Sequence, residues 1–289
     1  MLYTKEALEA GQKLRNAVIR YSAFDRALRH IVNAVELGNG TGIFAGVRII
    51  APSGSGKSLL IECLRKNIVD SPFLSGALSI ICTELKESPS VSQLQAGLLD
   101  NFNYPLEIGR RSTNNEVNRV LLAAIKEHNV KLAVIDEFQH IFTGNGDRAS
   151  LPILDWVKRF MNLTGLPVAV VGTQMLEKLS YSEPQFTSRV PTAIKLTPFR
   201  YDGDWIAFLR AFSEHCEAVD ISIIFDGNIS RKLFKVCEGS VRPLKALVIQ
   251  AVVMAITEGE EQLHEERLYH AFDMLFGSGG GAENPFIVP

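Results

Sequence analysis

The chain has 289 residues, 46% of them apolar, and a formal charge of −2 at neutral pH. No stretch reaches the ~18 consecutive apolar residues that cross a bilayer, and the charged start MLYTKEALEAGQKLRN predicts no secretory signal. With this net charge, nucleic acid could be bound only through a local basic patch or by many assembled copies. Scattered cysteines without a C-x-x-C pair are typical of reduced cytosolic thiols: Cys63, Cys82, Cys216 and Cys237.

Apolar residues at helical spacing predict two N-terminal helices, at 5–19 and 24–37, and GNGTG at 38–42 is expected to end the second. Five short apolar runs follow, each expected to form a buried strand: 47–51, 77–82, 131–136, 167–172 and 192–196. Helices are predicted between them, at 57–69, about 91–102, 115–128 and about 150–164. Continuous apolar strands that alternate with helices are typical of a parallel sheet covered on both faces.

From residue 202 onward the pattern predicts four helices and no convincing strand. The expected domains are an N-terminal helical segment, an α/β core, a small helical domain and a flexible C-terminal tail: 1–42, 43–199, 200–276 and 277–289. Glycines at 277–281 predict a linker, and the apolar end at 284–288 is expected to fray. The alternative for this end is a tethered peptide that docks on a partner.

The stretch APSGSGKS at 51–58 follows the first predicted strand and opens a helix, which is typical of a phosphate-binding loop. Glycines let successive N–H groups face an anion, and the start of the following helix adds its dipole. Lys57 is expected to reach the β- and γ-phosphates of ATP, and the Ser58 hydroxyl to bind Mg²⁺. Ala51 replaces the usual first glycine, at a cost of about 1 kcal/mol if its backbone is left-handed. The residues expected to contact ATP are Pro52, Ser53, Gly54, Ser55, Gly56, Lys57, Ser58 and Leu59.

Two adjacent acids end the third predicted strand in LAVIDEFQHI, residues 132–141. Asp136 is placed to hold Mg²⁺ directly or through water, and Glu137 to polarise a water for attack on the γ-phosphate. The alternative for the pair is a solvated turn. Phe138 is expected to pack under the sheet edge. Gln139 and His140 could face the nucleotide, a subunit interface or the next loop, and we assign them no catalytic role.

These motifs, with VGTQ at 171–174 and the C-terminal helices, resemble the AAA+ ATPase superfamily. IDEFQHI and LPVAVVGTQM at 166–175 are similar to the TniB/TnsC family of transposition ATPases, and the resemblance spans about residues 25–275. It implies an AAA+ P-loop fold with a five-stranded parallel sheet, N-terminal helices and a small helical lid. It also implies a slow ATPase of the bacterial cytosol that assembles on duplex DNA as a ring or helical filament. Such an ATPase would link a target-selector protein to a transposase.

The resemblance also implies roles for four further residues. Thr173 or Gln174 would be the polar sensor that reads the γ-phosphate or the attacking water. Arg189, in QFTSRVP, would be an arginine finger that reaches the nucleotide of a neighbouring subunit, and the alternative is a surface arginine. Arg242, in EGSVRPL, matches the second-sensor arginine that touches the phosphates from the lid.

The strongest basic cluster of the core is GRRSTNN at 109–115, with Arg119 further along the next helix. Arg110, Arg111 and Thr113 offer charged and neutral donors suited to DNA phosphates, and Lys86 could join them. The resemblance places central-pore DNA contacts in this region. We expect only sequence-independent contact with the DNA backbone, because nothing here reads base edges. The alternative is a solvated loop that caps the following helix.

Two other functions remain open. The chain could be an AAA+ switch of another kind, such as a replication-initiator, clamp-loader or secretion-associated ATPase, that acts on a protein partner. A small-molecule P-loop kinase is a weaker hypothesis, because the helical lid and the pair Arg189 and Arg242 would then lack a role.

Overall fold

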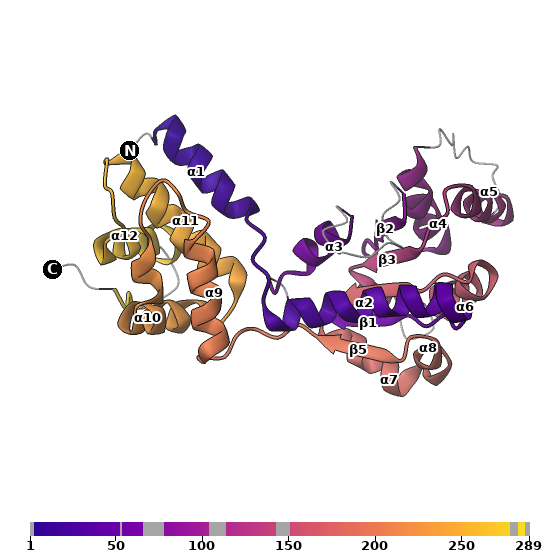
Figure 1. Ribbon diagram of the computed structural model, residues 1–289. Helices are drawn as coiled ribbons and strands as arrows, with labels where there is room; N and C mark the ends of the chain where they lie inside the picture. Colours follow the sequence, from indigo (N-terminus) through magenta and orange to yellow (C-terminus); the bar gives the residue numbers. More distant parts are fainter. Residues whose placement is uncertain are drawn as a thin grey trace. The chain divides into compact units, whose positions relative to one another are not determined.

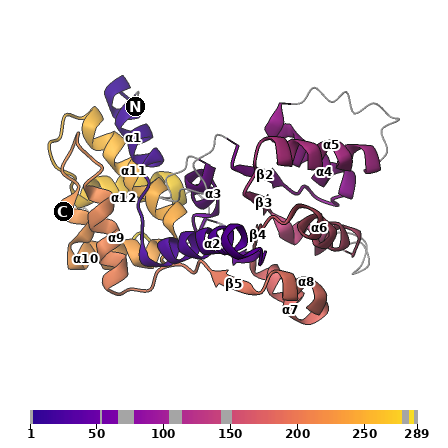
Figure 2. The same cartoon turned by 45° about the vertical axis from the view of Figure 1, so that its right-hand side comes forward.

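The computed structural model describes residues 3–52, 54–65, 78–103, 114–142, 151–277 and 283–286. The chain forms two units, each with its own apolar core (Figures 1 and 2). One unit, which we call the α/β unit, comprises residues 23–53 and 57–196, and the other, the helical unit, comprises 1–22, 54–56 and 197–289. Some predicted features lie outside the described residues: Ser53, Arg110, Arg111, Thr113, the end of the helix predicted at 57–69, and the linker at 278–281.

A five-stranded parallel sheet in the order β2-β3-β4-β1-β5 forms the centre of the α/β unit. Val134 of β3 pairs with Ala169 of β4, Ala169 pairs with Val47 of β1, and Val47 pairs with Thr192 of β5. Because the strands are parallel, the carboxyl ends of β1, β3 and β4 meet at one edge of the sheet. The strands are β1 (Val47–Ile50), β2 (Ile80–Glu84), β3 (Leu132–Asp136), β4 (Val168–Gly172) and β5 (Thr192–Lys195).

Helices connect these strands, as the alternating pattern predicted (Figure 1). They are α2 (Ser22–Thr41), α3 (Lys57–Arg65), α4 (Val91–Leu99), α5 (Asn114–Glu127), α6 (Leu151–Thr164), α7 (Leu179–Ser182) and α8 (Pro184–Arg189). Short 3-10 helices at Asp100–Phe102, Phe138–Phe142 and Gln174–Lys178 follow α4, β3 and β4. The pattern did not predict α7, α8 or the 3-10 helix after the acids, because each is too short to show a period.

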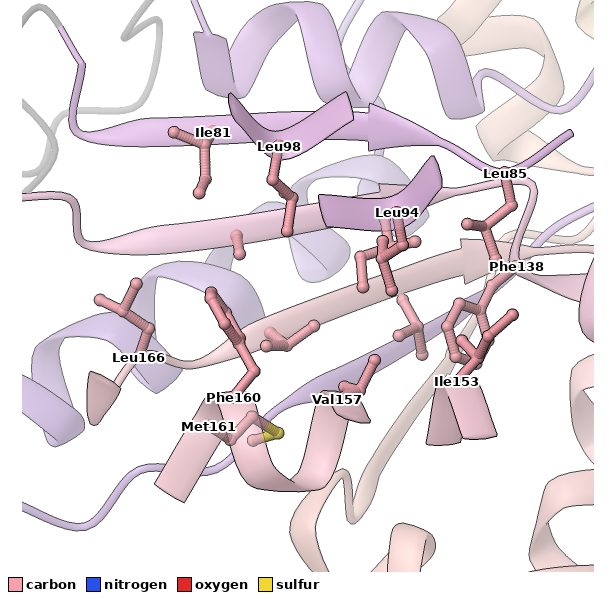
Figure 3. Packing of buried hydrophobic residues seen from close by; sticks show 14 of the residues in the cluster. Ile81, Leu85, Leu94, Leu98, Phe138, Ile153, Val157, Phe160, Met161 and Leu166 are labelled. Carbon is pink, nitrogen blue, oxygen red and sulfur yellow. The ribbon is translucent and has the colours of Figure 1, made fainter. Parts of the chain in front are cut away.

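The core of this unit lies between the sheet and helices α4, α5 and α6. Leu94 and Leu98 of α4 and Val157 and Phe160 of α6 lie in one buried cluster with strand residues such as Ile81 (Figure 3). Full burial of one such side chain stabilises the fold by about 1.5–3 kcal/mol. β3 and β4 are buried on both faces of the sheet, apart from Asp136 at the end of β3, which explains why their sequences are almost continuously apolar. In β5, at the edge of the sheet, only Ile194 is buried.

Asn101 covers the open edge of β2. Its Oδ1 accepts from the Cys82 N–H at 3.0 Å, and its Nδ2 donates to the Cys82 carbonyl at 2.8 Å. Nδ2 also donates to the Gly97 and Leu98 carbonyls, both at 3.1 Å. The side chain of Asn101 therefore supplies the bonds that another strand would make at the centre of β2.

Helix α2 extends through the stretch that was predicted to break it, and that prediction is wrong. The helix ends at Thr41, so GNGT lies inside it. Asn39 donates to the Val35 carbonyl at 2.8 Å and Thr41 to the Leu37 carbonyl at 2.7 Å, which satisfies carbonyls of the last turns. The ring of Phe44 packs against Gly38, where a Cβ would lie 2.7 Å from Cδ1. Tertiary packing thus outweighs the low helix propensity of glycine.

The helical unit is formed by helices from both ends of the chain. Leu14 and Ile19, near α1, are buried in one cluster with Trp205 and Leu247. Lys245 donates to the Ala17 carbonyl at 2.8 Å, beyond the end of α1. None of the described helices is long and apolar enough to cross a membrane. The helices are α1 (Lys5–Asn16), α9 (Gly203–Ser213), α10 (Gly227–Cys237), α11 (Val241–Thr257) and α12 (Glu265–Phe276), with a 3-10 turn at Ser222–Phe225.

This division differs from the expected segments. Residues expected as one N-terminal segment, 1–42, are shared between the units: those up to Ser22 group with the C-terminal helices, and the rest of α2 groups with the sheet. The apolar face of α1 packs against α11, where a Cβ on Gly11 would lie 2.8 Å from Val253. Such a close approach of two helices depends on a residue without a side chain and leaves no periodic signature in the sequence.

The C-terminal residues 283–286 dock on α12 of the same chain. Phe286 is 2% exposed and lies 6.3 Å from the ring of Phe272. Asn284 donates to the Tyr269 carbonyl at 3.1 Å and to the Asp273 carboxylate at 2.8 Å. These residues are therefore anchored within the chain, which differs from the frayed end expected of them.

Candidate nucleotide-binding site

The predicted phosphate loop begins at the end of β1 and leads into α3 at Lys57. Gly54 has φ +82° and Gly56 has φ +95°, the left-handed region in which glycine is unstrained. Ala51 is not among the described positive-φ residues, so alanine there carries no left-handed strain. Its N–H donates to the Gly172 carbonyl at 2.8 Å, which joins the base of the loop to β4.

Residues 54–56 of the loop belong to the helical unit, where three of its side chains lie close to them. The Tyr21 hydroxyl donates to the Ser55 carbonyl at 3.1 Å, and burial raises the pKa of Tyr21 to about 12. A Cβ on Gly54 would lie 3.0 Å from Cβ of Arg242 and 3.4 Å from the Ser240 hydroxyl. Arg242, for which the family resemblance implies a contact with the phosphates, is thus adjacent to a loop glycine.

The acid pair lies at the end of β3, and Lys57 joins it there. Lys57 Nζ lies 2.9 Å from Glu137 Oε1, with the two side chains 8% and 26% exposed. Asp136 accepts the N–H of Glu137 at 2.8 Å. Glu137 has φ +50°, a left-handed conformation that costs a non-glycine residue about 1–2 kcal/mol. Such outliers cluster at functional sites, and this one turns the Glu137 side chain toward Lys57.

The two carboxyl groups are shifted in opposite directions. Burial raises the pKa of Asp136 above its usual range, and this effect exceeds the opposing effects of the Glu137 N–H and of Lys57. Burial also acts to raise the pKa of Glu137, but hydrogen bonds from Lys57 and Gln139 outweigh it and hold that pKa below its usual range. Two adjacent acids whose pKa values are shifted in opposite directions suit different tasks. Perturbed pKa values of this kind are frequent at functional sites.

Gln139 is a functional candidate that the sequence left open. Its side chain is buried, and its Nε2 donates to Glu137 Oε2 while its Oε1 accepts the Thr173 N–H at 3.1 Å. A usable signal was present: Gln139 is a polar residue between Phe138 and Ile141, both of which are buried. Phe138 packs in the core as expected, 5.8 Å from the ring of Phe186 in α8 (Figure 3).

The two sensor candidates lie at the end of β4 in different surroundings. The Thr173 hydroxyl is buried and has no hydrogen-bond partner among the described residues. A buried hydroxyl in that condition costs about 1–3 kcal/mol, which a ligand oxygen could recover. Gln174 is exposed. The environment therefore favours Thr173 as the group that meets a ligand.

The oxygen donors of Ser58 and Asp136 suit magnesium. Both residues line one cavity of about 900 Å³, together with Thr83 and Glu84 at the end of β2. Mg²⁺ is usually held by one or two carboxylates plus phosphate oxygens and water, rather than by a cage of protein ligands. Within the described ranges no group of three or more His, Cys, Asp or Glu could hold a metal by itself. The residues therefore fit a phosphate-bound Mg²⁺.

The remaining predicted residues are dispersed. Arg189 ends α8, where its Nε lies 3.4 Å from the Asn162 Oδ1 and its Nη1 donates to the Gln185 carbonyl at 3.2 Å. Lys86 is exposed and lines the same cavity as Ser58. Arg119 is exposed on α5. The basic cluster at 109–113, which was expected to bind DNA together with Lys86 and Arg119, lies outside the described residues.

Several solved structures are similar to this chain in fold, at 14–16% sequence identity, and they show the α/β architecture of AAA+ P-loop NTPases. The ORC2 protein of Aeropyrum pernix, in ADPNP and ADP complexes, has a TM-score of 0.67 at 16% identity, over 91% of this chain and 72% of that one. The ORC1 protein of the same organism, in complex with DNA, has a TM-score of 0.65 at 15% identity, over 91% and 67%. The RuvB branch-migration motor of Thermotoga maritima has a TM-score of 0.54 at 14% identity, over 92% and 72%.

The family is more specific than the fold. The sequence model of the family described as bacterial TniB protein matches residues 12–201, more than half of the chain. The chain therefore belongs to the TniB family, the transposition-associated AAA+ ATPases that the motifs had suggested. No curated protein matches the sequence.

The Lys57–Glu137 ion pair predicts a pH dependence of stability. Because the pKa of Glu137 is lowered in the folded protein, the pair contributes stability above the usual range of glutamate, about 4.3. That contribution is lost as the pH falls through the lowered value. We expect the difference in unfolding free energy between the wild type and Glu137→Gln to be constant from about pH 7 to 5 and to shrink below about pH 4. Urea titrations at each pH measure it, and a difference independent of pH would contradict the pairing.

Proposed function

We propose that this TniB-family protein binds and slowly hydrolyses ATP with Mg²⁺, and that ATP binding assembles copies of it on duplex DNA. In that state it would link target selection to the transposase. The observation that carries the proposal is the approach of Lys57 to Glu137 at 2.9 Å, which brings the phosphate loop and the end of β3 together. Family membership supports the transposition role.

The chemistry follows from the residues at the carboxyl edge of the sheet. The N–H groups of the loop and the Lys57 ammonium would hold the β- and γ-phosphates, while Ser58 and Asp136 would hold Mg²⁺. A bound Mg²⁺ would supply positive charge that offsets charge on the phosphates. Glu137 would polarise the attacking water, because its carboxylate is ionised at neutral pH and lies beside the lysine that the phosphates would engage.

Three more residues would complete the site. Thr173 would bond the γ-phosphate or the attacking water through its buried hydroxyl. Arg242 would contact the phosphates, since it is adjacent to Gly54. Arg189 would act on the nucleotide of a neighbouring copy, the role that the family resemblance implies for it, and would have to leave its bonds to Asn162 and Gln185 to do so. Such an arginine finger raises phosphoryl-transfer rates by about 10³–10⁵-fold.

Substitutions at the ion pair separate binding from hydrolysis. We expect Lys57→Ala to weaken ATP binding by about 100-fold or more, because a buried charge contact to phosphate is lost. Glu137→Gln should bind ATP and hydrolyse it about 10²–10⁴-fold more slowly. Titration with a fluorescent ATP analogue and single-turnover phosphate release measure the two effects.

Matched controls for these substitutions lie on the surface of the α/β unit. Lys195→Ala removes a lysine whose ion pair with Glu177 is solvent-exposed, and Glu127→Gln neutralises an exposed acid at the end of α5. Both controls should bind and hydrolyse ATP within about twofold of the wild type, since exposed pairs contribute little. Unchanged ATP affinity in Lys57→Ala would overturn the phosphate-loop assignment.

The two sensor candidates can be told apart by isolated substitutions. Thr173→Val keeps the shape of the side chain and removes the buried hydroxyl, so we expect a fall in the single-turnover rate of about 10–100-fold with ATP affinity retained. Gln174→Ala should change the rate by less than about threefold, because the side chain is exposed. The reverse order of effects would assign the sensor to Gln174.

DNA binding has its own test in the basic cluster. Arg110→Glu with Arg111→Glu should weaken ATP-dependent binding to duplex DNA and lower the slope of log affinity against log salt by about 2, one unit for each lost phosphate contact. Lys13→Glu with Arg15→Glu, on α1, makes the same change of net charge and should leave the slope unchanged. Sedimentation with duplex DNA, with and without a non-hydrolysable ATP analogue, measures assembly. Assembly on a protein partner and not on DNA would favour an AAA+ switch of another kind.

A further inference from the structure

The side-chain amide of Gln139 bonds to two different strand ends. Gln139 lies in the 3-10 helix that follows β3, and its side chain is 6% exposed. Its Nε2 donates to Glu137 Oε2, beside the end of β3, and its Oε1 accepts the Thr173 N–H beyond the end of β4, at 3.1 Å. One side chain therefore connects the residue proposed to polarise water with the residue proposed to sense phosphate.

The surrounding structure holds this amide in place. A Cβ on Gly172 would lie 2.5 Å from Gln139 Oε1, so a glycine at the end of β4 makes room for the amide. On the other side, Phe138 and Ile141 are buried in the core and fix the 3-10 helix that carries Gln139. Glu137 adopts its left-handed backbone directly before this helix. The contact is thus part of a packed arrangement, and the amide has little rotamer freedom left to lose on binding.

The two oxygens of the Glu137 carboxylate have different partners. Lys57 approaches Oε1, and Gln139 donates to Oε2. Phosphate groups bound in the loop would compete with the Glu137 carboxylate for the Lys57 ammonium, because both anions bind this one cation. Gln139 carries no charge and does not face that competition. It can hold Glu137 while Lys57 engages phosphate, and its neutral bond leaves the carboxylate available as a base.

We propose that Gln139 is a positioning residue for ATP hydrolysis: it orients the Glu137 carboxylate and ties it to the Thr173 backbone, so that both groups keep one geometry around the γ-phosphate. This inference rests on the proposed role of Glu137 in activating water. It gives the glutamine of IDEFQHI a function in the same reaction as the preceding acid. Displacement of a positioned group by about 1 Å can cost about 100-fold in rate, so one amide can matter this much.

Three substitutions separate the two halves of the contact. Gln139→Met keeps the length of the side chain and removes both bonds. Gln139→Glu keeps an acceptor for the Thr173 N–H and replaces the donor to Glu137 by a like charge. The double variant Glu137→Gln with Gln139→Glu exchanges the two groups and restores an amide-to-carboxylate bond. Hydrolysis at saturating ATP, affinity for a fluorescent ATP analogue and thermal midpoints are measured for each.

We expect Gln139→Met to lower the single-turnover rate by about 10–100-fold while ATP affinity stays within about threefold of the wild type. In the Glu137→Gln background the same substitution should lower the residual rate by less than about twofold, because the two residues act as a unit. Substitution of a purely structural residue would instead lower the rate by the same factor in both backgrounds. The proposal would be overturned if the rate of Gln139→Met lay within twofold of the wild type. It would also be overturned if Gln139→Met lowered the rate by the same factor with and without Glu137→Gln.

Stability provides a second readout that does not depend on catalysis. Gln139→Glu should lower the thermal midpoint of the wild type by about 2–4 °C, because two carboxylates then face each other. In the Glu137→Gln background, which has already lost the ion pair with Lys57, it should lower the midpoint by less than about 1 °C, because an amide then faces the new carboxylate. If Gln139→Met fails to bind the ATP analogue because it is misfolded, this exchange still decides whether the contact exists. A fall of the same size in the wild type and in Glu137→Gln would overturn the contact.

The same experiment separates this inference from the proposed function. If Glu137→Gln hydrolyses ATP like the wild type, the assignment of Glu137 fails and the role of Gln139 fails with it. If Glu137→Gln is inactive while Gln139→Met is normal, the ATPase assignment stands and only the positioning role is overturned.

Discussion

The candidate site depends on one ion pair, between Lys57 and Glu137, which is largely shielded from water. A lysine and a glutamate removed from water are each destabilised, so both must be held where they compensate one another. Parallel strands provide that geometry, since β1 leads into the phosphate loop at the edge where β3 ends in the acids. The left-handed backbone of Glu137 is a local strain in this arrangement, and the buried 3-10 helix after it holds the strained residue in place.

Most strands and helices could be predicted from the sequence because each produces a local pattern of apolar residues that repeats along the chain. The five strands are short and mostly apolar, and the sheet brings Lys57 close to the acid pair. The helices of the second half were visible from their period. A phosphate-binding loop could be predicted because residue type alone indicates it, through the glycines, the lysine and the serine of the stretch.

The rest depended on specific side-chain contacts, most of them between residues far apart in the chain. The end of α2 could not be predicted from GNGT, because the packing of Phe44 against Gly38 keeps that stretch helical. The place of α1 depends on its approach to α11 at Gly11, more than 200 residues before Val253 in sequence order. The contacts of Gln139 could not be predicted either, although the polar residue between Phe138 and Ile141 was a signal, since its second partner, Thr173, lies 34 positions away.

The side chain of Asn101 also constrains how copies of this protein can join. An open β-strand edge is the commonest way for one sheet to continue into another, whether in a functional assembly or in an aggregate. At the middle of β2 both backbone groups of Cys82 are already bonded to Asn101, so a second sheet finds neither donor nor acceptor there. An encounter between two such sheets at this edge would therefore meet side-chain surface at Cys82 in place of free backbone groups, which lowers the tendency of the edge to aggregate.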